Sequence, residues 1–249
     1  MGDHWYHRDA SPCYEVEGKP TTLRHARKMN LVPSPTSVLG VIHKPGLQTW
    51  KDNQLFEAAR SLPDASLGEV KGKAGEIAAE AAEKGTGIHD SIERLIAYSE
   101  GRVEDYHIPD DVMDPHAQAA FLEWYATNGC HSIWIERYIP TTYGYGGRCD
   151  WVGTMASEGE QIVTVDWKSQ STKNGKINWY KEWPIQLAAY AQALELLDHP
   201  IASVVISTTE PGLVEHKIWG SPRNFIHVWH CVFDLWKWQK GYDPLDLPF

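Results

Sequence analysis

The chain has 249 residues, of which 42% are hydrophobic and 22% charged, as in an ordinary globular protein with one well-buried domain. Its 33 acidic residues outnumber its 23 basic ones, and the net charge of -10 excludes a protein that coats nucleic acid non-specifically, because such affinity comes from Lys and Arg that neutralise phosphates. No run of about 18 apolar residues is present and the N-terminus is polar, so we expect a cytoplasmic protein without a membrane segment or secretory signal.

The first half of the chain predicts helices. The first 30 residues show little periodicity and are expected to be mostly irregular, and a short segment follows at 36–42 between prolines. Apolar residues then recur at helical spacing, although the stripe of the second helix is interrupted at Gly85-Thr86-Gly87. The expected helices span 47–62, 67–98 and the run that Pro115 opens and Asn128-Gly129 ends.

The second half of the chain predicts a sheet with two further helices. Three strands are expected at 132–139, 146–155 and 161–168, with 157–160 as the turn between the last two. A helix at 185–197 follows, with Pro184 in its first turn. Two more strands at 201–207 and 213–219 and a helix at 225–238 complete the expected elements. Helices first and strands later indicate an α/β or α+β domain whose sheet has helical flanks.

Asp166-Trp167-Lys168 is the most informative tripeptide in the sequence. Side chains alternate along a strand, so Asp166 and Lys168 lie on one face and can address the same phosphate. Counting back across a turn at Glu158-Gly159 places Asp150 opposite Trp167, between the other two residues. We therefore expect Asp150, Asp166 and Lys168 to converge from adjacent strands.

Convergent carboxylates favour Mg²⁺ or Mn²⁺, which take oxygen ligands and keep waters that a substrate phosphate replaces. One or two such ions activate a water and stabilise the charge of phosphodiester cleavage. Lys168 would orient or help to deprotonate the attacking water.

These residues resemble a known family. Asp150 followed by Asp166-x-Lys168 is similar to the PD-(D/E)xK nuclease signature, and Gln186-x-x-x-Tyr190 resembles the motif of its RecB-like and phage-type exonuclease branch. Gly85-Thr86-Gly87-Ile88-His89 is similar to the GTxxH element of that branch, and residues 32–50 more loosely resemble the start of phage and prophage members. All of these motifs occur in the order that the family shows.

The resemblance implies a restriction-endonuclease-like core, a mixed central sheet flanked by helices, in one nuclease domain over 1–249. Its helical part would be about 30–128, and its catalytic sheet and helices about 130–249. It implies that His89, Asp150, Asp166 and the backbone carbonyl of Trp167 hold the metal and that Lys168 is the catalytic lysine. Gln186 and Tyr190 would position the substrate or the lysine. The cysteines are scattered, at Cys13, Cys130, Cys149 and Cys231, so the iron–sulfur cluster of some members is not expected.

Several other residues are candidates with a second interpretation that is equally good. Glu136 on the preceding strand would add a carboxylate to the metal site, or be an edge-strand charge. Glu93 would accept a hydrogen bond from His89, or be solvated. The candidates for substrate binding lie beside Asp150 and in the loop 169–182, where a solvated lysine loop is the alternative: Arg148, Lys173, Lys176, Trp179 and Lys181.

The sequence thus predicts a Mg²⁺-dependent DNA exonuclease of phage or prophage type, working in the host cytoplasm on linear ends, with a recombination or annealing protein as a further partner. Two alternatives remain open. One is a nuclease-like fold that binds DNA ends without cutting them, against which the intact Asp150, Asp166 and Lys168 weigh. The other is an endonuclease of the same fold.

Overall fold

The computed structural model describes residues 4–246, so the ends of the expected domain, 1–3 and 247–249, lie outside the described part. Its centre is a five-stranded mixed sheet in the order β5-β6-β7-β8-β9, in which only β7 and β8 run parallel. The strands are β5 (Cys130–Ile139), β6 (Gly147–Met155), β7 (Gln161–Gln170), β8 (Ile201–Ser207) and β9 (Val214–Gly220). The expected mixed α/β sheet domain with helical flanks is confirmed.

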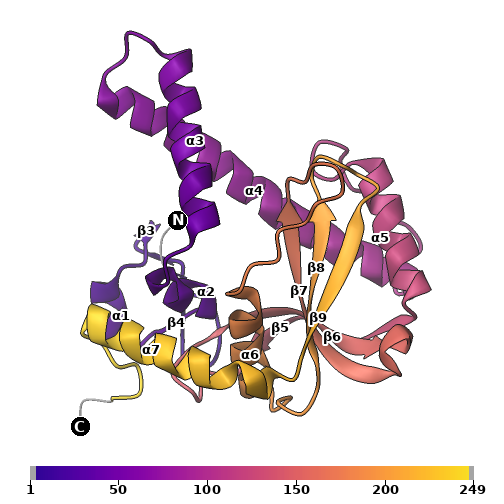
Figure 1. Ribbon diagram of the computed structural model, residues 1–249. Coiled ribbons are helices and arrows are strands. Elements are labelled where there is room, and N and C mark those ends of the chain that lie inside the picture. The colour runs from indigo at the N-terminus through magenta and orange to yellow at the C-terminus, as the bar shows by residue number, and fades with distance from the viewer. Residues whose placement is uncertain (1–3, 247–249) are drawn as a thin grey trace.

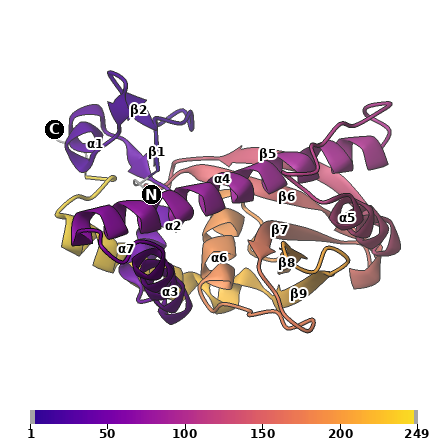
Figure 2. The ribbon, with the colours of Figure 1, turned by 90° about the horizontal axis from the view of Figure 1, so that it is seen from above.

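Helices cover both faces of the sheet (Figures 1 and 2). On one face, α4 (Leu67–Ser99) and α5 (Pro115–Thr127) pack against Trp167 and Val204 in one apolar cluster. On the other face, α6 (Trp183–Ala193) packs Leu187 and Ala191 against Ile201, and α7 (Ile226–Lys240) packs against α6. Successive strand residues point to opposite faces, so the sheet has an apolar core on each side.

Helix α4 runs without a break through residues 85–87, where its apolar stripe is interrupted, so the expected helix at 67–98 is confirmed. Gly87 has a packing role. A Cβ on Gly87 would lie 2.8 Å from Cγ1 of Val112, and one on Gly85 would lie 3.5 Å from Oγ of Ser169, near the end of β7. A Cβ would thus make an ordinary contact at position 85, whereas the lack of a side chain at Gly87 lets α4 pass close to the segment that leads into α5. The other half of α4 pairs with α3 (Pro45–Ser61), and the two project from the body as a helical arm (Figure 1).

The N-terminal segment is more regular than expected. It contains α1 (Leu23–Met29), α2 (Pro35–Val38) and four short strands, which are β1 (Trp5–Tyr6), β2 (Glu15–Val16), β3 (Lys19–Pro20) and β4 (Val32–Pro33). Thr22 caps α1, and the side chain that completes its capping box is His25 instead of the usual Glu or Gln. Ala26 of α1 is buried in a cluster with Trp236 of α7. A helix of this length is stabilised mainly by such tertiary packing, which local periodicity does not reveal.

The register between β6 and β7 differs by one residue from the count made on the sequence. Met155 pairs with Gln161, so the connection contains the five residues 156–160 and is centred on Glu158. It consists of a short 3-10 turn followed by Gly159 and Glu160 in the left-handed conformation. Asp150 therefore falls opposite Asp166, and not opposite Trp167 as predicted.

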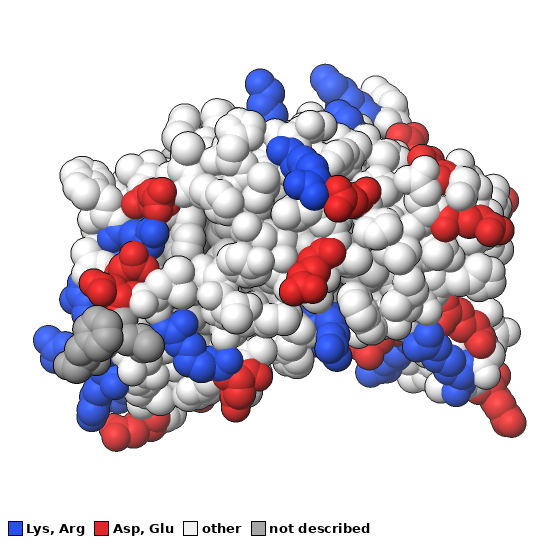
Figure 3. All heavy atoms as spheres, turned by 90° about the horizontal axis from the view of Figure 1, so that it is seen from below, with Lys and Arg blue, Asp and Glu red and all other residues white. Residues whose placement is uncertain are grey.

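Charged side chains are dispersed over the face seen in Figure 3, where Lys and Arg alternate with Asp and Glu between uncharged residues. Within residues 4–246, no helix has the length and apolar character needed to span a membrane.

Candidate active site

Three carboxylates form a row across three adjacent strands. In the β5–β6 ladder, the pairs on either side of Glu136 of β5 place it opposite Asp150 of β6. The β6–β7 ladder ends at the pair of Trp151 with Val165, and its continuation by one residue places Asp150 opposite Asp166 of β7. Residues directly opposite each other project from the same face of a sheet. Asp150 and Asp166 are buried, and the side chain of Glu136 is only 10% exposed. We call Glu136, Asp150 and Asp166 the acidic row.

The backbone of Glu136 departs from strand geometry. Its φ is 51°, in the left-handed region, and the ladder of β5 has already shifted by one residue between Ser132 and Trp134. A non-glycine residue in this conformation costs on the order of 1 kcal/mol or more and persists where the surrounding structure imposes it. Of the two interpretations of Glu136, the structure favours the carboxylate at the site, because an edge-strand charge would be solvated.

His89 brings α4 to the acidic row. Its Nδ1 lies 3.5 Å from Oδ2 of Asp150, and the ligand atoms of His89, Glu136 and Asp150 all lie within 4.8 Å of one another. Among the described residues, this is a group of side chains suited to holding a metal ion, and Asp166 is outside it. Of the two interpretations of Glu93, the structure favours the solvated charge, because Glu93 is exposed and the carboxylate that contacts His89 is that of Asp150.

Lys168 lies at the other end of the acidic row, in an ion pair with Asp166. Its Nζ donates to Oε1 of Gln186 (3.3 Å), and Nε2 of Gln186 donates to Oδ1 of Asp166 (3.1 Å) and to the hydroxyl of Tyr190 (3.1 Å). Gln186 and Tyr190 occupy the same face of α6, as their spacing predicts. The amide of Gln186 thus connects the lysine, the carboxylate and the phenol.

Two residues near Lys168 were not singled out from the sequence. The Nζ of Lys168 lies 5.8 Å from the ring centroid of the buried Trp183, one turn before Gln186 on α6. Lys44 precedes α3 and is partly buried. Burial lowers its pKa, Glu182 opposes the shift, and the ammonium of Lys168 adds to it. The helical spacing of Trp183 and Gln186 could have indicated that Trp183 lies near Lys168. The position of Lys44 near Lys168 depends on tertiary packing, which the sequence does not show.

Trp167 is fixed through both its backbone and its side chain. Its backbone N–H donates to Oδ2 of Asp150 (2.8 Å), while its indole is buried against Phe121, Trp124 and Trp151 on the opposite face. The expectation that its backbone carbonyl holds a metal stays a prediction.

The carboxylates of the acidic row fall into two groups, because the pKa of Asp150 is lowered whereas those of Asp166 and Glu136 are raised. Burial disfavours the ionised form of Asp150, but His89, Lys168 and the Trp167 N–H together hold the pKa of Asp150 below its ordinary value. Burial likewise opposes the charge of His89, yet Asp150 and Asp166 raise the pKa of His89 above its usual range. Asp150 and His89 therefore favour an ionised pair.

Asp166 and Glu136 behave in the opposite way. Burial and the neighbouring charge of Asp150 raise the pKa of Asp166 to about 6, although Lys168 counteracts the shift, and they raise that of Glu136 to about 7, although Arg148 counteracts it. The buried Oδ2 of Asp166 is paired with Lys168, and the buried Oε2 of Glu136 is paired with Arg148. The pKa values of both carboxyl groups are nevertheless raised, so one cationic side chain each does not offset burial and the charge of Asp150, and a bound cation would add the missing positive charge.

The predicted substrate-binding residues differ in how far their side chains are already engaged within the protein. Arg148 forms an ion pair with Glu136. Lys173, Lys176 and Lys181 are exposed. Trp179 is half-buried and packs edge-on against Trp183 and Trp219, with Nζ of Lys217 5.9 Å from its ring centroid. Its ring is therefore already engaged within the protein.

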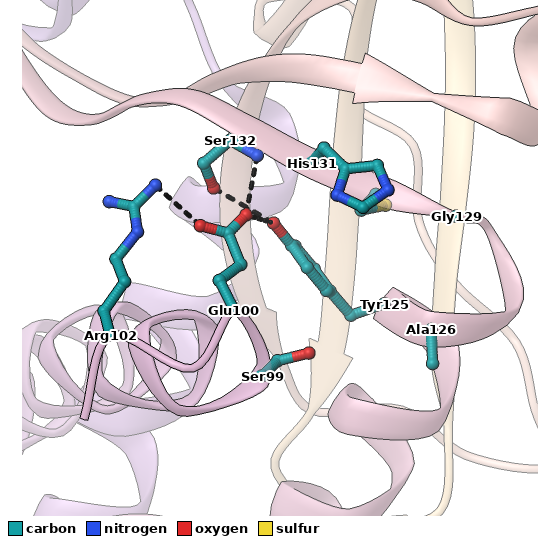
Figure 4. A pocket seen from close by; sticks show the side chains of 9 residues that line it. Ser99, Glu100, Arg102, Tyr125, Ala126, Gly129, His131 and Ser132 are labelled. Carbon is teal, nitrogen blue, oxygen red and sulfur yellow. Dashed lines mark hydrogen bonds and ion pairs between the residues drawn. The ribbon is translucent and has the colours of Figure 1, made fainter. Parts of the chain in front are cut away.

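A separate pocket of about 660 Å³ lies at the start of β5 (Figure 4). Glu100 projects into it and accepts hydrogen bonds from the hydroxyl of Tyr125 (2.7 Å) and the backbone N–H of Ser132 (2.6 Å), and it pairs with Arg102 at 2.6 Å. Its carboxylate is thus fully partnered. This network ties the end of α4 to the irregular start of β5, and we regard it as structural.

Comparison with known proteins identifies no family for this chain. No protein-family model matches the sequence, and no curated protein matches it. Among solved structures, the chain is similar to the crystal structure of SSO0001, with 13% identity, a TM-score of 0.30, and coverage of 66% of this chain and 84% of that chain. A likeness this weak supports no conclusion about fold or activity, so the function is argued from the geometry of the site.

Proposed function

We propose that the protein is a metal-dependent deoxyribonuclease that hydrolyses DNA phosphodiester bonds, and that its sheet is a restriction-endonuclease-like core. The observation that carries the proposal is the acidic row, with His89 at one end and Lys168 at the other. Buried carboxylates are costly unless they are paired or bind a cation. A lysine within reach of the same carboxylates adds a group suited to phosphate chemistry.

The donor set fits a hard divalent cation. His89, Glu136 and Asp150 offer one nitrogen and carboxylate oxygens within 4.8 Å of one another, and Asp166 adds a buried oxygen that accepts no hydrogen bond. Mixed His and carboxylate sites suit Mn²⁺, and carboxylates with water suit Mg²⁺. One or two ions bound by these residues would act as Lewis acids and lower the pKa of a water at neutral pH.

Lys168 would act on the reacting phosphate and the attacking water. Its ammonium is held by Asp166 and Gln186 beside the ring of Trp183, so its direction is set before substrate binds. A cation oriented in advance offsets the charge that develops on the phosphate without reorganisation during the reaction. Gln186, itself bonded to Tyr190, would keep Asp166 and Lys168 in this arrangement.

DNA would be held by local positive charge, since the chain as a whole is acidic. Arg148, Lys173, Lys176 and Lys181 are the residues that we expect to contact phosphates. Trp179 is less suited to stacking than the sequence suggested, because its ring packs within the protein. Linear DNA ends in the cytoplasm, and a recombination or annealing protein that acts with the nuclease, remain the partners that we propose from the resemblance.

Incubation with linear and circular duplexes of one sequence, with Mg²⁺, with Mn²⁺ and with a chelator, tests the proposal. Metal-dependent digestion of the linear form alone is expected for an exonuclease, and digestion of both forms would identify an endonuclease. Binding without cleavage under every condition would refute nuclease activity.

Lys168→Ala provides the matched variant for this experiment. We expect it to lower kcat by about 10²- to 10⁴-fold while DNA affinity stays within a few fold, because the lysine acts mainly on the transition state. Turnover like that of the unmodified protein would show that Lys168 is not part of the reaction. Lys173→Ala, in the exposed loop, is the control for the loss of one positive charge.

A further inference from the structure

Three tyrosines gather beside the acidic row. Tyr6 is buried and packs edge-on against Tyr14 and Tyr138, with ring centroids 5.9 Å and 6.4 Å away. The hydroxyls of Tyr6 and Tyr14 are 3.0 Å apart. Tyr14 and Tyr138 nevertheless remain 47% and 40% exposed. We call Tyr6, Tyr14 and Tyr138 the tyrosine cluster, in which one buried ring supports two that face solvent.

The tyrosine cluster is connected to the candidate metal site through Arg148. Tyr138 follows Glu136 by two residues on β5 and lies directly opposite Arg148 in the β5–β6 ladder. Arg148 pairs with Glu136, and its guanidinium is close enough to Tyr138 and Tyr14 for ionisation of these phenols to raise the pKa of Arg148. Two residues of strand span about 7 Å, so Tyr138 lies about one nucleotide step from the acidic row.

An open pocket of about 630 Å³ continues from Tyr138. Arg8, Arg137 and Thr141 line it together with Asp9, whose carboxylate accepts hydrogen bonds from Ser11. Arg8 and Arg137 thus bring positive charge to the pocket that Tyr138 lines, although the guanidinium of Arg8 donates to the backbone carbonyl of Asn30 and that of Arg137 lies over the ring of Trp134. Arg148 lies directly opposite Tyr138 in the ladder. Positive charge next to exposed aromatic rings suits phosphates joined to bases that offer a free face.

We propose that the tyrosine cluster and this pocket bind unpaired nucleotides of the strand whose phosphate lies at the acidic row. The inference rests on the proposed nuclease function and adds the substrate class: a single strand, or a duplex end with unpaired bases. Bases inside a duplex have both faces covered by their neighbours, and a blunt end exposes only the outer face of its last base pair, so two exposed tyrosines would gain less from a blunt duplex than from unpaired bases. A site that grips only the backbone needs cations and no rings.

The test is fluorescence anisotropy with a labelled single strand and the blunt duplex of the same sequence, in Ca²⁺ so that binding is measured apart from cleavage. Wild type should bind the single strand more tightly. Tyr14→Ala and Tyr138→Ala should each weaken single-strand binding roughly 5- to 150-fold, the ratio that corresponds to about 1–3 kcal/mol of stacking per base, and leave duplex binding nearly unchanged.

Tyr14→Phe and Tyr138→Phe keep the rings and should bind like the wild type, which separates stacking from misfolding. Tyr98→Ala is the matched control, because Tyr98 is 41% exposed and packs against Tyr106 away from the acidic row. Unchanged single-strand affinity in both alanine variants would overturn the inference, as would an equal loss for single strand and duplex. Failure of the nuclease proposal appears separately, as a lack of cleavage by wild type in Mg²⁺ or Mn²⁺.

Discussion

Replacing Glu136 by Gln should make the metal-free protein more stable at alkaline pH. Glu136 is buried beside Asp150, and burial together with the charge of Asp150 raises the pKa of Glu136 from 4.5 to about 7. The folded protein therefore holds the proton of Glu136 more tightly than the unfolded chain does. The resulting stability is fully present below a pH of about 4.5 and is lost as the pH rises through about 7.

The size of the effect follows from the shift. One pKa unit corresponds to about 1.4 kcal/mol, so a rise from 4.5 to about 7 sets an upper bound of about 3 kcal/mol. Solvent reaches part of the group, and we take about 1–2 kcal/mol as the realistic range. For a chain of this size, each kcal/mol moves the melting temperature by roughly 2–4 °C, so we expect a change of about 2–8 °C.

The assay is thermal unfolding of the wild type and Glu136→Gln in a chelating buffer, at about pH 5 and about pH 8, on either side of the shifted pKa. The variant should gain stability relative to wild type only at the higher pH. Added Mn²⁺ should stabilise wild type more than the variant, because ligands that bind only the folded state raise its stability. Glu123→Gln, an exposed carboxylate on α5, is the control and should show no pH-dependent difference.

The difference in melting temperature between wild type and Glu136→Gln decides the interpretation. A constant difference at both pH values would show that Glu136 is ionised without cost in the folded protein. Equal stabilisation of both proteins by Mn²⁺ would show that Glu136 does not contribute to the metal site.

Three further predictions concern Asp166, Trp183 and Gly153. Asp166→Ala should weaken Mn²⁺ binding about 10- to 100-fold, measured by calorimetry. Asp198→Ala, which removes the carboxylate of an exposed ion pair, is the control and should leave Mn²⁺ affinity unchanged. An unchanged affinity in Asp166→Ala would show that Asp166 has a structural role only. Trp183→Leu should lower kcat about 2- to 30-fold with an unchanged KM, because it removes the ring beside Lys168. Trp183→Phe keeps an aromatic ring and should retain most of the rate. Equal losses of kcat in the two variants would argue against the cation–π contact. Gly153→Ala should destabilise the fold by about 3 kcal/mol or more in thermal unfolding, because its Cβ would lie 2.2 Å from the carbonyl oxygen of His131. Gly40→Ala is the control: its Cβ would meet no atom within 4 Å, so its melting temperature should equal that of wild type.

The sequence anticipated the parts of the site that depend on local periodicity. Asp166 and Lys168 share a strand face because side chains alternate, and their ion pair follows from that. Gln186 and Tyr190 are hydrogen-bonded to each other because residues four apart meet on a helix. The five strands were also located to within a few residues, since each is an apolar segment bounded by turn-forming residues.

The register between β6 and β7 was harder to predict from the sequence, because it depends on the length and the conformation of the turn that joins the two strands. A connection of five residues, with Gly159 and Glu160 in left-handed conformations, moved Asp150 from its expected place opposite Trp167 to one opposite Asp166. The same limit applies to Glu136, for which sequence reasoning left two interpretations equal. Its place in the acidic row follows from the irregular ladder of β5 and its own φ of 51°.

By itself, then, the sequence determined the order of the helices and sheet strands from α3 onward, the shared strand face of Asp166 and Lys168, and the shared helix face of Gln186 and Tyr190, because these follow from the repeats of strands and helices. Only the tertiary structure decided that Glu136 and His89 meet Asp150, and that tyrosines from the N-terminal segment and β5 gather beside them. Such meetings depend on the close approach of α4 and on the register of β5, which are set by packing between segments distant in the chain.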